Sequence, residues 1–61
     1  MDQYIKEQIK ELLASLTALR DQMNICHPQL YEMGYIEHSD EVEGAAKLVD
    51  GWIAGIIEET K

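Results

Sequence analysis

The chain has little of what small proteins use in place of a large core. Among 61 residues it has one Cys, one Pro and no Phe. Its five Lys and Arg residues are outnumbered by twelve Asp and Glu residues. A single Cys excludes an intrachain disulfide framework. Ordering a chain costs roughly 1.5 kcal/mol of conformational entropy per residue. The core of so short a chain barely offsets this cost unless its helices pack regularly or it self-associates. We therefore expect one small helical domain over residues 1–61.

The charge is negative and unevenly distributed. The net charge is −7; residues 1–31 carry four acids and three bases, whereas residues 32–61 carry eight acids and two bases. Bulk nucleic acid is excluded as a ligand, because phosphate contacts need clustered Lys and Arg. An acidic surface is compatible with a basic protein partner. No signal peptide or membrane-spanning segment is recognisable, so a cytoplasmic location is expected.

Residues 3–25 are predicted to form the first helix. They lack Gly and Pro and are rich in good helix formers. Apolar residues recur at alternating intervals of four and three, which is a heptad pattern and predicts one narrow buried face. This seam has Ile9, Leu16 and Met23 at position a, and Ile5, Leu12, Leu19 and Cys26 at position d.

The region after this helix is predicted to reverse the chain. Pro28 should end the first helix, because the residue before Pro disfavours the helical conformation. A short helical turn over about 28–33 follows, with Gly34 as a left-handed stop. Ser39 or Asp40 is expected to cap a second long helix over about 40–59. The predicted fold class is an all-α helical hairpin, which we expect self-association to complete as a bundle.

The second helix is predicted to have two buried faces. One is a seam with intervals of four and three, formed by Val42, Ala46, Val49, Ile53 and Ile56. Three glycines cluster away from it, although each interior Gly costs roughly 0.5–1 kcal/mol relative to Ala. The alternatives are drift on a tolerant surface and the close approach of another backbone or a flat ligand, and we favour the second. The predicted oligomer interface or ligand-approach residues are Gly44, Leu48, Gly51, Trp52 and Gly55.

The rare residues of the connecting region do not form a recognisable reactive site. Cys26 and His27 are adjacent, which disfavours their binding one ion, and His38 is isolated, unlike the paired ligands of structural zinc. A Cys–His nucleophile would need an orienting group and an oxyanion donor, and neither is indicated. Cys26 fits better as a small buried hydrophobe in the first seam. We expect no enzyme activity, metal or cofactor.

The same region is unusually rich in large apolar and aromatic residues. Two interpretations remain open, and the first is slightly favoured: these residues close the end of the bundle core, or they form an anchor patch for a partner, with acids including Glu32 as its rim. The predicted partner-binding residues are Leu30, Tyr31, Met33, Tyr35, Ile36, Glu37, Asp40 and Glu41.

Three functional hypotheses follow. The first is a non-enzymatic interaction or inhibitor protein that binds a larger, basic protein, of the kind that phages and mobile elements encode against host enzymes. The second is nucleotide capture at subunit interfaces, because the layout of two helices and a short connector resembles the helical-hairpin sponges with which phages sequester cyclic nucleotides. The third is a homodimerisation module. In the second, Tyr31, Tyr35 or Trp52 would stack on a base, and Arg20 or Lys47 would contact phosphate.

Overall fold

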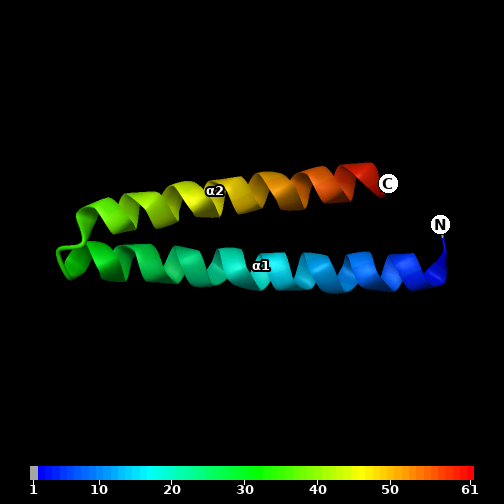
Figure 1. Cartoon of the computed structure of the whole chain (residues 1–61), viewed down its shortest axis with the longest axis horizontal. Coiled ribbons are helices and arrows are strands. Elements are labelled where there is room, and N and C mark those ends of the chain that lie inside the picture. The colour runs from blue at the N-terminus through cyan, green and yellow to red at the C-terminus, as the bar shows by residue number, and fades with distance from the viewer. Residues whose placement is uncertain (1) are drawn as a thin grey trace.

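A computed structural model describes residues 2–61 as two long antiparallel helices (Figure 1). Helix α1 spans Gln3–Glu32 and helix α2 spans Ile36–Glu59. Both termini lie at one end, where α1 extends past the end of α2 (Figure 1). The hairpin is long and thin, with principal extents of 48 × 15 × 10 Å. The predicted all-α helical hairpin is confirmed. In the described residues, neither helix carries an apolar stretch of the length that crossing a membrane requires.

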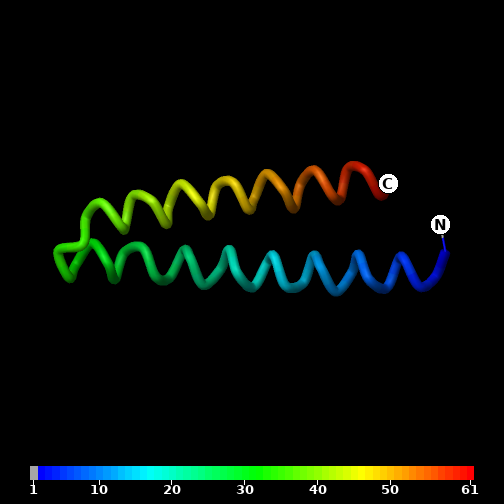
Figure 2. The backbone as a smooth tube through the Cα atoms, viewed as in Figure 1, coloured from blue at the N-terminus to red at the C-terminus, as the bar shows by residue number. Residues whose placement is uncertain are grey.

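Helix α1 continues through Pro28, so the prediction that this residue ends the helix is wrong. The expected helical turn over 28–33 is the last part of α1, which coils without interruption up to the connector (Figure 2). Pro28 lacks the N–H that would bond to the carbonyl of Asn24, a cost of about 3 kcal/mol in a helix interior. Half-buried Leu30, which follows Pro28, faces α2. Its burial and the bonds at the helix end offset part of that cost.

The chain reverses at Gly34, as predicted. Gly34 has a φ of +92°, a conformation that residues with a Cβ rarely adopt. The Tyr35 N–H donates to the Leu30 carbonyl at 2.9 Å, and the Gly34 N–H donates to the Tyr31 carbonyl at 3.0 Å. This pair of bonds is a Schellman motif, which satisfies carbonyls left free at a helix end. The connector is therefore only Met33–Tyr35.

Helix α2 begins earlier than predicted. Its first residue is Ile36, and its N-cap is Tyr35, whose side chain makes no capping bond. Ser39 and Asp40 lie within the helix, so the prediction that one of them caps it is wrong. The Ser39 N–H donates to the Tyr35 carbonyl at 2.9 Å, closing the first turn. After the Schellman motif, only Tyr35 separates Gly34 from Ile36, the first residue of α2. The connector is short for this reason.

The core lies along the predicted seam of α2. Ala46, Val49 and Ile53 are its buried apolar residues, and Val42 and Ile56 are half-buried. This face packs along the length of α1, as the side-by-side helices show (Figure 1). Within residues 2–61 the buried apolar core comprises only those first three side chains.

Helix α1 uses a different edge of its heptad pattern from the predicted one. No residue of Gln3–Glu32 is buried, and apart from Thr17 its half-buried residues lie at positions a and e rather than a and d. The d residues are exposed, which corrects the expectation that Ile5, Leu12, Leu19 and Cys26 lie in the core of the hairpin. The half-buried residues at the two positions are Ile9, Leu16, Met23 and Leu30 at a, and Leu13, Arg20 and His27 at e.

Candidate interaction surfaces

A hydrogen bond between the helices positions the connector end. The Ser39 hydroxyl donates to the His27 carbonyl at 2.7 Å, and Ser39 is 4% exposed. His27 immediately precedes Pro28, so this bond joins the last turns of α1 to the first turn of α2. Among residues 2–61, every buried side-chain nitrogen or oxygen has a hydrogen-bond partner. The backbone that carries the aromatic side chains of the connector is thus held at both helix ends.

Most apolar side chains of residues 30–36, at the connector end of the hairpin, face outward. Tyr31, Met33, Tyr35 and Ile36 are between 50% and 70% exposed, whereas Leu30 is half-buried. Four of the five therefore lie outside the core of the single hairpin, and only Leu30 contributes to it. We call Tyr31, Met33, Tyr35 and Ile36 the connector patch.

Acidic side chains surround the connector patch. Glu32, Glu37, Asp40 and Glu41 are all exposed, as the polar rim predicted for this region requires. From Asp21 to Ala46 the chain contains six Asp and Glu and no Lys or Arg. A shallow hollow lies between the helices here and is lined by His27, Pro28, Tyr31, Glu32, Ser39, Asp40 and Glu43.

The two His of this region each lie beside a carboxylate. His27 Nδ1 is 3.9 Å from a Glu43 oxygen, and His38 Nδ1 is 3.6 Å from a Glu41 oxygen. The His38 ring also lies beside Tyr35, with ring centroids 6.0 Å apart. Cys26 is exposed on α1. Across residues 2–61, no three His, Cys, Asp or Glu side chains gather as metal ligands would.

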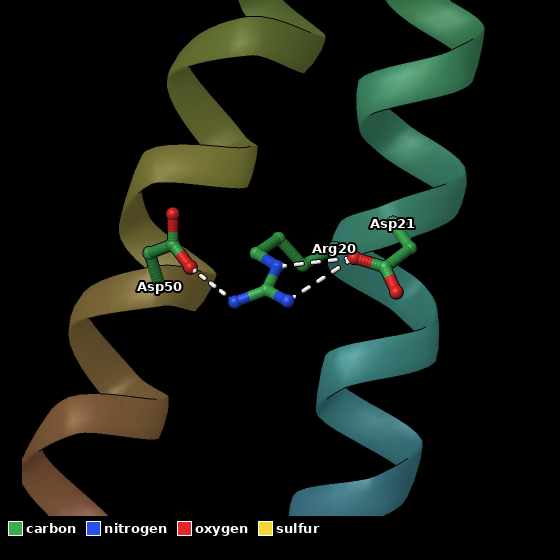
Figure 3. A network of polar contacts seen from close by, with 3 residues as sticks. All are labelled: Arg20, Asp21 and Asp50. Carbon is green, nitrogen blue, oxygen red and sulfur yellow. Dashed lines mark hydrogen bonds and ion pairs between the residues drawn. The ribbon is translucent and has the colours of Figure 1, made fainter.

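Arg20 connects the helices along one edge of their interface. Its Nη1 donates to Asp50 on α2 at 2.7 Å, and its Nη2 donates to the neighbouring Asp21 at 3.1 Å (Figure 3). The hydrogen bond to Asp50, followed by that to Asp21, raises the pKa of the guanidinium above its ordinary value. Lys47 Nζ lies 3.6 Å from Glu43. Both cations that we assigned to a nucleotide phosphate thus lie next to carboxylates.

The opposite edge of the same interface is apolar. Arg20 and His27 approach α2 at Asp50 and Glu43, which marks the polar edge. At about 100° per residue, Leu19 lies about 100° from Arg20 around α1, and Trp52 lies about 160° from Asp50 around α2, with the seam between each pair. Both side chains therefore border the other edge.

The exposed apolar residues of this second edge form one face across both helices. On α1 it carries the d row, and on α2 it carries Leu48 and Trp52, with exposed fractions of 61% and 55%. We call this surface the apolar face; its residues are Ile5, Leu12, Leu19, Cys26, Leu48 and Trp52. The predicted residues Leu48 and Trp52 belong to it. Its α1 half was missed, although the apolar Leu13 at position e is a sign in the sequence that rows a and e could pack together.

The glycines of α2 are not approached by the rest of the chain. A Cβ added at Gly44, Gly51 or Gly55 would meet no atom within 4 Å. The close approach predicted there is thus not made by α1. Gly55 lies about one helical turn from the exposed Trp52 and about two turns from Leu48, whereas Gly44 and Gly51 lie on the side of α2 opposite to α1.

A second hollow at the open end was not predicted from the sequence. It is lined by Lys6, Ile9, Lys10, Leu13 and Thr60, and its volume is about 320 Å³. It forms because α1 and α2 end at different levels, and no local motif indicates the pairing of Thr60 with the first turns of α1.

The comparisons with known proteins identify no relatives. No known protein family matches the sequence, and neither the curated proteins nor the solved structures contain a significant match. The functional argument therefore comes from the geometry of the hairpin.

Proposed function

We propose that this chain is a non-enzymatic interaction protein that binds a larger, basic protein through its connector end. The observation that supports this most strongly is the exposure of the connector patch, with Met33 at 70% and Tyr31 at 59%. Large apolar side chains that are exposed and rimmed by polar groups are typical of protein interfaces, in which Tyr and Met are enriched.

The charge around the patch favours a basic partner. Among residues 2–61, no Lys or Arg forms an ion pair with the four rim acids Glu32, Glu37, Asp40 and Glu41. Such a surface accelerates association with a positively charged patch and disfavours acidic partners. An inhibitor of a basic host enzyme, as encoded by phages and mobile elements, is one protein of this type.

The test is affinity capture with matched tyrosine variants. The full chain serves as bait for a cell lysate, in parallel with the double variant Tyr31→Ala/Tyr35→Ala. Tyr4→Ala is the control, because Tyr4 is 69% exposed but lies at the opposite end of α1. We expect one basic protein to be retained by the unmodified chain and by the Tyr4 variant, and its retention to fall at least tenfold with the double variant.

Salt dependence separates this proposal from nonspecific adhesion. Retention of the partner should weaken as the salt concentration rises, because salt screens exposed charges beyond about 8–10 Å. Equal retention by all three baits would contradict a contact through the connector patch. Retention of acidic proteins alone would contradict the charge argument.

A further inference from the structure

We propose that the apolar face is the contact surface for a second copy of this chain, giving an antiparallel four-helix bundle. This surface lies on the flank of the hairpin, so the inference does not rest on the connector patch or on its partner. Three observations favour a second copy on this surface: the exposed area, the pattern of uncharged residues and the distribution of charge.

The exposed area matches what a dimer requires. The chain exposes 4721 Å², whereas a compact monomer of its mass, 7.0 kDa, exposes about 4,000 Å². The excess of about 700 Å² approaches the area of about 800 Å² that each partner contributes to a standard interface. A second hairpin stacked on the apolar face would remove this excess and give α1 the buried side chains that it lacks.

The flank of α1 that would meet the second copy carries no charge. Its d row is apolar, its a row is shared with the hairpin core, and the next row outward is uncharged from Gln8 to Gln29. All Lys, Arg, Asp and Glu of residues 5–30 lie in the other heptad rows. The uncharged row consists of Gln8, Ser15, Gln22 and Gln29. A basic partner would find no acidic side chain to pair with on this flank. A second copy would present the same uncharged flank to it.

The spacing of the d row fits an antiparallel copy. The row is symmetric about a point between Leu12 and Leu19, so a two-fold axis there places Leu12 opposite Leu19 of the second copy. The same axis places Ile5 opposite Cys26. Arg20 lies level with Asp50 in the hairpin, so Trp52 lies close to this axis on α2.

Charge distribution favours connectors at opposite ends of the dimer. Residues 21–46 carry a net charge of −6, and the rest of the chain carries −1. A dimer with both connectors together would place the two acidic halves at one end, where like charges repel. The antiparallel arrangement separates them and leaves a connector patch free at each end.

The first test is the association state of the full chain in reducing buffer. By sedimentation equilibrium we expect twice the 7.0 kDa mass of the chain. Leu19→Glu should raise the dissociation constant at least a hundredfold, whereas Ala18→Glu should not, because Ala18 places the same charge on the side of α1 opposite to α2. If Leu19→Glu does not fold, the unmodified chain still decides: its melting temperature should rise with protein concentration. A monomeric mass with a concentration-independent melting temperature would overturn the proposal.

The second test uses the native Cys26 as a probe of orientation. Ile5→Cys adds a second thiol that the antiparallel dimer places beside Cys26 of the other copy, so mild oxidation should give a covalent dimer. Within one chain the two thiols are about 31 Å apart on the same helix and cannot pair. Glu7→Cys is the control, because position 7 faces away from the apolar face. Cross-linking of Ile5→Cys no faster than that of Glu7→Cys would overturn the antiparallel arrangement.

Discussion

Ser39 illustrates how one residue acquires a role that local sequence does not reveal. Its position before a run of acids is typical of a helix cap, and its hydroxyl instead donates to the His27 carbonyl at 2.7 Å across the two helices. Ser39 is also the buried polar residue of the hairpin, at 4% exposure. The bond fixes the angle at which α2 leaves the connector.

Ser39→Ala should lower the free energy of unfolding by about 1 kcal/mol, because the net value of one hydrogen bond is lost. The measurement is urea denaturation followed by circular dichroism at fixed protein concentration. Asn24→Ala on exposed α1, outside the flank proposed to meet a second copy, is the control and should leave stability unchanged or slightly raised. Equal effects of both substitutions would show that the Ser39 bond contributes nothing.

Gly34 and Gly51 should respond in opposite directions to the same substitution. Gly34→Ala should cost about 1 kcal/mol, because a φ of +92° is strained for a residue with a Cβ. Gly51→Ala should stabilise α2 by about 0.5–1 kcal/mol, because the added Cβ meets no atom within 4 Å. Thermal unfolding of both variants measures this. Destabilisation by Gly51→Ala would indicate that a second backbone packs against the glycines of α2.

At the scale of the helices, Pro28 shows where a local rule yields to its surroundings. The residue before Pro disfavours helix, yet α1 passes through Pro28 and ends four residues later. The Schellman bonds, the burial of Leu30 and the Ser39 bond all require the last turn of α1. The Ser39 hydroxyl that bonds to α1 comes from α2, so the sequence around Pro28 does not reveal it and local analysis places the helix end too early.

Pro28→Ala should therefore stabilise the hairpin, by up to about 3 kcal/mol, because the N–H of Ala restores the bond to the Asn24 carbonyl. Urea denaturation of this variant checks the expectation. The substitution Glu11→Ala, on the side of α1 opposite to α2, is the control and should change stability by a few tenths of a kcal/mol, since both residues are good helix formers. A destabilised Pro28→Ala variant would show that the native end of α1 depends on the rigid ring.

The heptad pattern predicted the two helices and the α2 seam, and Gly34 predicted the turn, but the pattern did not select the edge of α1 that packs. Row a packs in either case, because it lies between rows d and e. Of these two rows, d is the more apolar. The structure uses row e, in which Arg20 and His27 contribute partly buried side chains whose polar ends reach Asp50 and Glu43. Their long side chains cover apolar surface while they keep polar contacts. Hydrophobicity alone undervalues such residues.

The connector patch shows the same limit for the candidate site. Its residues and its acidic rim were identified from composition, but their direction was not. Which way Tyr31 and Tyr35 point depends on α1 continuing to Glu32, and so on the helix boundary that the sequence analysis misplaced. The edge of the hairpin that stays exposed depends likewise on the packing of row e.

At the scale of the whole molecule, we propose that the hairpin is half of a bundle. Its buried apolar core of three side chains is small for a chain of 61 residues, since ordering alone costs roughly 1.5 kcal/mol per residue. In the proposed dimer the apolar face supplies the missing burial, and the two connector patches lie at opposite ends. A dimer of this form would bind two copies of the proposed partner, or one partner with two sites, with the gain that linked binding gives.

The fluorescence of Trp52, followed as the protein is diluted, tests the proposed dimer most directly. Trp52 is 55% exposed in the hairpin and lies near the centre of the proposed dimer contact. Its emission should be blue-shifted at high protein concentration and should shift to the red on dilution, with a midpoint at the dissociation constant found by sedimentation. Emission typical of a water-exposed indole at every concentration would contradict the account.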